Sequence, residues 1–226
     1  MIAEIEKYLD ELFPNPKCEL DFNKDYELLI AVVLSAQTTD KRVNSVTSIL
    51  FNKYPNLNAL CEANIEDIGN IIKPIGTYHK KAVFVKEIAS ILLRDYDGKV
   101  PNDRKSLEKM PGVGRKTTNV VLSVLFNESA IAVDTHVSRV SKRLGLANKN
   151  DDVLKIEKKL MKKIDKSNWS RRHHQLVLFG RYHCKAMSPR CDTCKLKDIC
   201  KKQRWFEPLF FYNFIRYIFT SSTPSI

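Results

Sequence analysis

The amino-acid sequence predicts an all-α protein. Apolar residues recur at intervals of three and four through most of the chain, as in Ile2, Ile5, Leu9 and Leu12. The alternation of apolar and polar residues that indicates a half-buried strand is nearly absent. Prolines and glycines separate the periodic segments and mark where helices must end.

Each helix can be placed by its apolar pattern and its end signals. The segment 26–36 is almost wholly apolar, which predicts a buried helix. The next helix has hydroxyl and acidic residues available for capping, and it must end before Pro55. Lys73-Pro74 and Gly98 close two later helices. The expected helical segments are 2–13, 26–36, 38–55, 64–76, 78–98, 100–112, 115–126, 135–145, 152–164 and 171–182.

Composition excludes several classes of protein. The chain has 226 residues, 43% of them hydrophobic and 28% charged, with 7 glycines and 9 prolines, which is typical of a folded protein and not of a disordered one. This length allows one large domain or two modest ones. The N-terminus lacks the pattern of a secretory signal, and no apolar run is long enough to span a bilayer. We therefore expect a cytoplasmic protein.

Basic residues are concentrated in one part of the chain. The formal net charge is +12 overall, yet residues 1–100 carry −3 and residues 101–203 carry +14. A basic half beside a mildly acidic one favours a face that binds a polyanion. A solvated, lysine-rich surface is the plainer interpretation, above all for the stretch KIEKKLMKKIDK at 155–166.

A glycine-rich turn joins two of the expected helices at MPGVGRKTTNVV, residues 110–121. Gly112 and Gly114 permit left-handed backbone and close approach of another chain. The helix that follows directs unpaired N–H groups and a positive dipole end toward the turn, which suits a phosphate. Arg115 and Lys116 add positive charge there. A tight helix–helix turn without a ligand is the alternative for the glycines alone.

Four cysteines gather near the end of the folded region. Cys184, Cys191, Cys194 and Cys200 have the spacing C-x6-C-x2-C-x5-C, whereas Cys18 and Cys61 lie far away and are expected to be buried thiols. In an intracellular chain such a group indicates a metal site more than disulfides. The three unequal gaps suit an iron–sulfur cluster, and zinc remains an alternative.

These motifs together resemble the endonuclease III family of helix-hairpin-helix DNA glycosylases. The matching blocks are LSAQTTDKRVN at 34–44, MPGVGRKTTNVV, AVDTHVSR at 132–139 and GRYHC with the three later cysteines. The resemblance runs from residue 1 to about residue 203. It implies two helical domains flanking a DNA-binding cleft: a six-helix domain at 18–128, with the helix-hairpin-helix at about 104–126, and a domain formed by 1–17 with 129–203.

The resemblance also implies the activity and its central residues. Members remove oxidised pyrimidines from double-stranded DNA and cut the resulting abasic site by β-elimination, so damaged duplex DNA is the expected partner. Lys116 would attack the sugar of a flipped nucleotide, and Asp134 would stabilise the positive charge that develops on the sugar. Arg115, the helix N-terminus and exclusion of water should favour the uncharged, nucleophilic amine. The four cysteines would hold a 4Fe–4S cluster.

Other DNA contacts carry over by position. Gln37 matches the residue that fills the space left by the flipped nucleotide, and Gly112, Val113, Gly114 and Arg115 form the hairpin contact. Thr77 stands where the family often has an apolar wedge, so we expect a weaker wedge or one shared with Tyr78. His136 could contact phosphate or pack in the cleft wall, and Asp40 is expected to cap a helix. Lys185 and Arg190, between the first two cysteines, could reach phosphates.

Three rival functions and one unmatched segment remain. The rivals are a glycosylase for mismatched adenine, which would have serine or a similar residue in place of Lys116, a glycosylase for thymine in G·T pairs, and a non-catalytic DNA-binding redox module.

Residues 204–226 match nothing in the family and hold 8 of the chain's 21 aromatic residues. Because this tail follows the last cysteine, we expect it to be dispensable for chemistry. A monomer associated with a prokaryotic nucleoid is the family expectation.

Overall fold

The computed structural model describes residues 1–201, and this part of the chain is helical with no strand. The all-α prediction is confirmed. The tail at 204–226 lies outside the described residues. The helices are α1 (Ile2–Leu12), α2 (Asp25–Leu34), α3 (Asp40–Lys53), α4 (Leu57–Glu62), α5 (Ile65–Ile72), α6 (Tyr78–Asp95), α7 (Arg104–Leu107), α8 (Arg115–Phe126), α9 (Thr135–Arg143), α10 (Val153–Lys163) and α11 (Trp169–Leu178). A 3-10 turn (Lys166–Asn168) precedes α11 and a π-helix (Phe179–His183) follows it.

The structure adds one helix and shortens others. Helix α4 was not expected, because six residues are too few to show a period; the Asn56 side chain begins it by accepting the N–H of Ala59 at 2.8 Å. Helix α6 ends before Gly98, whose N–H donates to the carbonyl of Leu92 at 2.8 Å and whose φ is +73°. This left-handed glycine ends the helix three residues earlier than its apolar pattern indicates.

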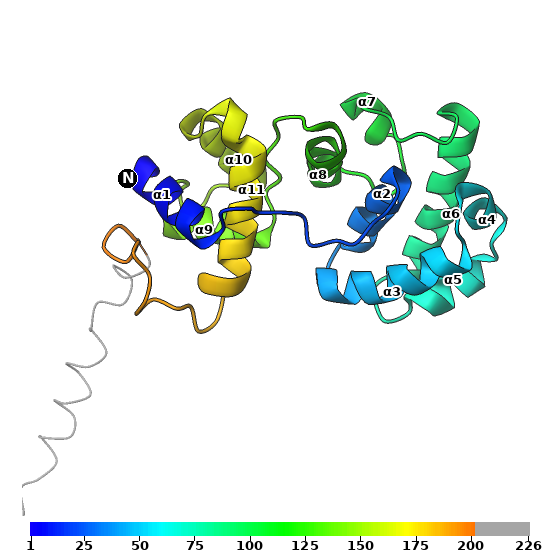
Figure 1. Ribbon diagram of the computed structural model, residues 1–226, viewed down its shortest axis with the longest axis horizontal. Helices are drawn as coiled ribbons and strands as arrows, with labels where there is room; N and C mark the ends of the chain where they lie inside the picture. Colours follow the sequence, from blue (N-terminus) through cyan, green and yellow to red (C-terminus); the bar gives the residue numbers. More distant parts are fainter. Residues whose placement is uncertain (202–226) are drawn as a thin grey trace, which may run out of the picture.

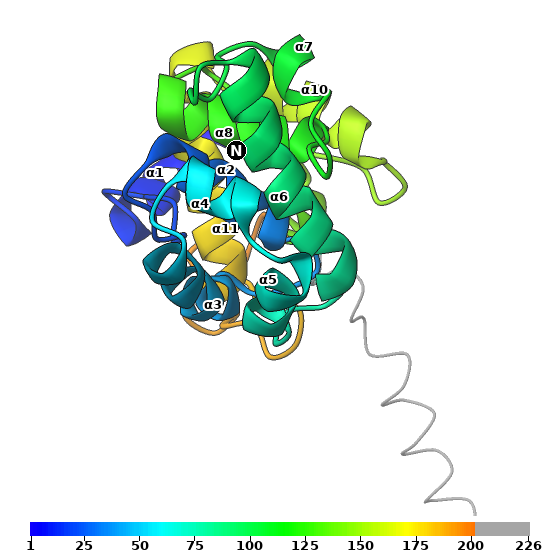
Figure 2. The same ribbon diagram turned by 90° about the vertical axis from the view of Figure 1, so that its right-hand side faces the viewer.

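The buried apolar side chains form two separate cores. The first gathers residues of α2 to α8, with Leu28, Leu50 and Ile88 fully buried. The second gathers residues of α1, α9, α10 and α11, together with Leu196 from the cysteine loop. We call these the first and second lobes. Figure 1 shows them side by side, joined by the segments 13–24 and 127–134, and Figure 2 views the molecule from the side of the first lobe.

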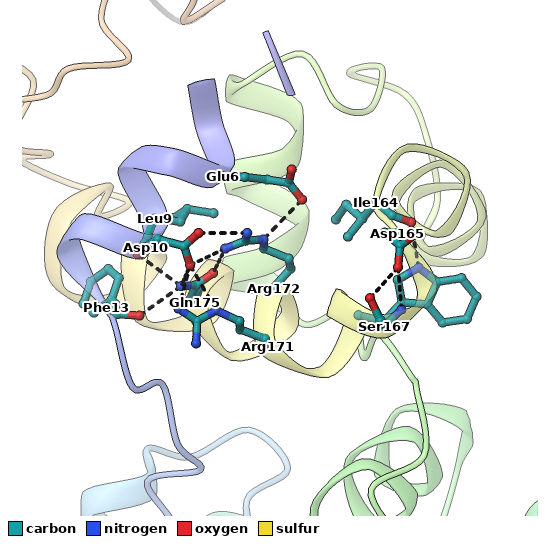
Figure 3. A network of polar contacts seen from close by, with 11 residues as sticks. Glu6, Leu9, Asp10, Phe13, Ile164, Asp165, Ser167, Arg171, Arg172 and Gln175 are labelled. Atoms are coloured by element: carbon teal, nitrogen blue, oxygen red, sulfur yellow. Dashed lines mark hydrogen bonds and ion pairs between the residues drawn. The ribbon is translucent and has the colours of Figure 1, made fainter. Parts of the chain in front are cut away.

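Polar contacts fasten the N-terminal helix to the second lobe. Asp10 of α1 accepts hydrogen bonds from Arg171 at 2.7 Å, Arg172 at 2.6 Å and Gln175 at 3.0 Å, all on α11 (Figure 3). Arg172 also pairs with Glu6 at 3.2 Å. The hydrogen bond from Arg172 holds the pKa of the Asp10 carboxyl well below its usual range. The first helix therefore belongs with the last, more than 150 residues away.

Candidate active site

The glycine turn between α7 and α8 rests on the core of the first lobe. Gly112 has a φ of +75°, and a Cβ there would lie 2.7 Å from the Phe84 ring and 2.9 Å from Val33. Only glycine fits that position, since both the backbone conformation and the space exclude a side chain. At Gly114 a Cβ would meet nothing within 4 Å. That second glycine leaves open room in front of the helix.

Helix α8 presents its N-terminus to this open room. No side chain caps α8, whose N-cap residue is Gly114. Its first N–H groups therefore remain available to a ligand, at the positive end of the helix dipole. Lys116 is the second residue of the helix and is exposed. An anion at this end would meet backbone donors and the lysine together.

Lys116 and Asp134, eighteen residues apart in sequence, line one pocket between the lobes. The first lobe contributes Lys116 and Asp40, and the second contributes Asp134, His173 and Arg181. The structure therefore brings together the two residues that the sequence motifs single out for chemistry, and it surrounds them with further charged groups.

The backbone that carries Asp134 is held in place from three sides. Asp134 is the N-cap of α9, and its carboxylate accepts the N–H of Val137 at 2.7 Å. Asn119 of α8 donates to the carbonyl of Ile131 at 2.9 Å. The ring of His173 hydrogen-bonds the backbone of Ala132. Because α8 also carries Lys116, the Asn119 contact couples the positions of the lysine and the carboxylate.

His173 is a buried, uncharged group beside the lysine. Its side chain is only 4% exposed. Burial, with smaller contributions from the charges of His174 and Lys116, lowers the pKa of His173 to about 3. Its Nδ1 atom is buried without a hydrogen-bond partner.

Arg115 is placed differently from the expectation. Its guanidinium donates to both carboxylate oxygens of Glu157 on α10, at 3.0 Å and 2.5 Å. The Glu157 side chain is 3% exposed and that of Arg115 is 49% exposed. The hydrogen bond that Arg115 donates to Glu157 raises the pKa of Arg115. The arginine thus ties α8 to the second lobe, and the carboxylate balances the charge that was expected to act on Lys116.

Asp40 does not cap its helix, contrary to the expectation. Thr39 is the N-cap of α3 and accepts the N–H of Arg42, while Asp40 pairs with Arg181 of the second lobe at 2.6 Å. Arg181 also pairs with Glu19, which accepts a hydrogen bond from the Tyr182 hydroxyl at 2.5 Å. The pair closes one side of the pocket. Sequence patterns could not reveal it, because its partners are about 140 and 160 residues apart.

Two residues expected to enter the duplex, Gln37 and the wedge-position Thr77, share an unusual backbone conformation. Gln37 has a φ of +59° and Thr77 a φ of +56°, and both are exposed. Tyr78 is half-buried against the first core, so its ring is engaged in packing. His136 is half-buried, and a Cβ on Gly180 would lie 2.8 Å from its Cβ, which favours the packing role.

The four clustered cysteines line a single pocket in the second lobe. They are free thiols, and no three Cys, His, Asp or Glu side chains among residues 1–201 converge closely enough to hold one metal ion. Arg143 lies beside them: its Nη1 donates to Cys184 Sγ at 3.3 Å and to the carbonyl of Lys185 at 2.7 Å. Lys185 and Arg190 are exposed on the loop between the first two cysteines.

The other two cysteines are only half-buried, so the expectation of buried thiols holds in part. Cys18 lines the pocket that contains Lys116, and burial raises the pKa of its thiol. Among residues 1–201, no helix has the length and apolar character needed to cross a membrane.

Comparison with known proteins identifies the family of this chain. Residues 30–166 match the model of the HhH-GPD superfamily of base excision DNA repair proteins. The chain is 50% identical to endonuclease III of Bacillus subtilis (strain 168) over 204 residues, which cover 89% of this chain and 93% of that protein. It is 44% identical to endonuclease III of Escherichia coli (strain K12), over 88% of this chain and 93% of the relative.

Solved structures match as well. A trapped covalent intermediate of endonuclease III with DNA, in an estranged-adenine complex, has a TM-score of 0.84 and 50% identity over 88% of this chain and 94% of that one. A non-covalent endonuclease III–DNA complex gives 0.87 and 48%, over 91% and 97%. A thermostable thymine-DNA glycosylase, at 22% identity and a TM-score of 0.77, shares the fold. The chain therefore belongs to the HhH-GPD superfamily and, within it, to the endonuclease III family.

Proposed function

We propose that this protein is a bifunctional DNA glycosylase and abasic-site lyase that removes oxidised pyrimidines from duplex DNA. The observation that carries the proposal is the shared pocket of Lys116 and Asp134, placed at the uncapped N-terminus of α8. The endonuclease III relatives, and the covalent DNA intermediate solved for one of them, support an enzyme of base excision repair that uses a covalent step.

The chemistry assigned to Lys116 follows from its position and type. Its neutral amine attacks the sugar C1′ of the flipped nucleotide, and the C1′–N bond breaks as the base leaves with the electron pair and gains a proton. The attached nitrogen then loses a proton, and its lone pair forms the C1′=N double bond as the C1′–O4′ bond breaks and O4′ gains a proton. The ring-opened iminium that results acidifies the C2′ proton. Loss of that proton forms the C2′–C3′ double bond and expels the 3′ phosphate with the electrons of the C3′–O bond. Asp134 stabilises the positive charge that develops on the sugar ring during the first step.

The remaining predicted contacts divide into two kinds. The turn of Gly112, Val113 and Gly114 grips a phosphate through backbone N–H groups, which fixes register without reading sequence. Gln37 and Thr77 enter the space vacated by the flipped nucleotide, and Lys185 and Arg190 approach the backbone from the cysteine loop. Arg115 retains an exposed portion that could also reach a phosphate while it holds Glu157.

For the cysteine pocket we propose a 4Fe–4S cluster as a structural element. The four thiols line one cavity, their unequal sequence gaps suit a cluster, and the Arg143 guanidinium offers charge to the Cys184 sulfur. The cluster would fix the loop that carries Lys185 and Arg190. Analysis of purified protein for iron and acid-labile sulfide tests this, and zinc without iron would contradict it.

Two of the rival functions are disfavoured on specific grounds. An adenine mismatch glycosylase would have serine or a similar residue at position 116, where this chain has lysine. A non-catalytic module has no need to keep Lys116 and Asp134 in one pocket. The thymine glycosylase shares the fold at 22% identity, so the two substrates must be separated by assay. We further expect the enzyme to work at the nucleoid of a prokaryotic cytoplasm, where its substrate lies.

Strand cleavage without alkali tests the proposed activity. Duplex DNA with a single thymine glycol in a labelled strand is incubated with the protein and analysed with and without hot alkali. A lyase gives the same cleaved fraction in both samples, because the enzyme itself breaks the strand. Cleavage only after alkali would indicate a glycosylase without lyase activity. A duplex of the same sequence that carries a G·T mismatch in place of thymine glycol shows whether mismatched thymine is the preferred substrate.

A further inference from the structure

Lys81 is a buried cation that the proposed chemistry does not use. The residue lies in the first turn of α6 and is 3% exposed. Its ammonium donates to the carbonyl of Leu34 at 2.9 Å and to that of Ala36 at 2.7 Å. Both of these acceptors are main-chain atoms. Burial lowers the pKa of Lys81.

The two carbonyls belong to the end of α2 and the turn that follows it. Ala36 directly precedes Gln37, whose backbone is left-handed with a φ of +59°. The C-terminal end of a helix carries partial negative charge, so a lysine there satisfies open carbonyls and interacts favourably with the dipole. Without the ammonium, these two carbonyls would lose their charged donor.

Lys81 is also joined to Thr77, the residue at the expected wedge position. The backbone N–H of Lys81 donates to the carbonyl of Thr77 at 3.2 Å, and Thr77 is the N-cap of α6 with a φ of +56°. A non-glycine residue in the left-handed region costs about 1–3 kcal/mol and persists only where surrounding contacts enforce it. Two such residues, from separate segments of the chain, are therefore linked through one residue: the Lys81 ammonium holds the carbonyl that precedes Gln37, and the Lys81 backbone holds Thr77.

We propose that Lys81 is a positioning residue that locks Gln37 and Thr77 into one rigid unit for entry into the duplex. This inference rests on the proposed function, which assigns DNA contact to those two residues. Burying an ammonium costs free energy that burying an apolar side chain would not. The hydrogen bonds to the Leu34 and Ala36 carbonyls, which fix the turn before Gln37, give the buried charge a role. A pre-formed unit reduces the ordering cost of filling the space left by a flipped nucleotide.

The test measures insertion directly. The full-length protein is titrated with duplex DNA that contains an uncleavable tetrahydrofuran abasic site opposite 2-aminopurine, whose fluorescence reports unstacking of the opposite base. We expect Lys81→Met to weaken binding about tenfold, a loss of about 1.4 kcal/mol, and to reduce the fluorescence change at saturation. Gln37→Ala should have the same two effects. Because Lys81 acts through Gln37, the double variant should bind no more than about twofold more weakly than Gln37→Ala.

Lys86 provides a matched control on the same helix. Its ammonium donates to a single backbone carbonyl, that of Ala63, at 2.8 Å. Lys86→Met should bind the duplex and change the fluorescence as the unaltered protein does. If Lys81→Met does not fold, Lys81→Gln replaces it, since a shorter neutral donor cannot hold both carbonyls.

Three outcomes would overturn the inference: a Lys81 variant that inserts like the unaltered protein, multiplicative losses in the double variant, or an equal loss in Lys86→Met. Borohydride trapping of the unaltered protein on an abasic duplex is run beside the titration. Failure of that reaction would count against the proposed function, and normal trapping with unaffected Lys81 variants would count against this inference alone.

Discussion

At the scale of single residues, the pocket and its surroundings contain some residues that sequence motifs predict and others that no motif predicts. Lys116 and Asp134 stand in recognisable local blocks, so the motifs predict a role for both, and the structure places the two residues in one pocket. His173 and Glu157 cannot be assigned in this way, because their roles depend on partners about 40 residues away. The histidine reaches Ala132, and the glutamate binds Arg115. Long-range pairing of this kind leaves no spacing pattern in the chain.

His173 makes a prediction about stability and pH. Its pKa is about 3 in the folded protein and 6.5 for the ordinary group, so between these values the unfolded chain binds a proton that the folded one does not. Stability therefore falls as the pH drops from 6.5 toward 3, by at most about 1.4 kcal/mol per pH unit from this group. His173→Gln keeps a donor for Ala132 and should flatten that slope in urea unfolding at a series of pH values. An unchanged slope would show that His173 is not the responsible group.

At the scale of elements, the two glycines of the hairpin have different structural roles. Gly112 is required by the packing of the turn against α2 and α6, and Gly114 faces open space at the N-terminus of α8. The sequence pattern predicted both helices and the turn. It could not distinguish the two glycines, since the clash at position 112 arises from Val33 and Phe84, which are distant in sequence.

The two glycines give a matched pair of variants. Gly112→Ala should destabilise the protein by roughly 1–3 kcal/mol, because the new methyl group meets the Phe84 ring at 2.7 Å in a left-handed backbone. Gly114→Ala should cost less than about 1 kcal/mol of stability, as an N-cap change, yet weaken binding to an abasic duplex, since its methyl group occupies the open room. Thermal unfolding and DNA titration separate the two effects. Equal destabilisation by both variants would refute the assignment.

At the scale of the whole molecule, the two lobes enclose the pocket and are bridged by ion pairs. Arg115 with Glu157 and Arg181 with Asp40 each join one lobe to the other. The division into 18–128 and 1–17 with 129–203 stays a prediction, which the two hydrophobic cores support. The sequence motifs could predict which residues enter the site. They could not predict how the two lobes face each other, because that arrangement depends on ion pairs between residues that are distant in sequence.

Arg181 tests whether these bridges hold the pocket. Arg181→Met leaves the Asp40 and Glu19 carboxylates without their partner, and Asp40 is 17% exposed. We expect a loss of roughly 2–4 kcal/mol in the free energy of unfolding, together with slower base release. Arg94→Met, which removes an exposed pair with the adjacent Asp95, should change neither quantity. Similar behaviour of the two variants in unfolding and activity assays would contradict a bridging role for Arg181.

The central claim is that Lys116 forms the covalent bond to DNA, and borohydride trapping tests it most directly. The protein is incubated with duplex DNA containing one thymine glycol, borohydride is added, and the products are separated under denaturing conditions. The account predicts a covalent protein–DNA adduct for the unaltered protein, none for Lys116→Ala, and a strongly reduced yield for Asp134→Asn. An adduct that persists in Lys116→Ala, or base release by the unaltered protein without any adduct, would contradict it.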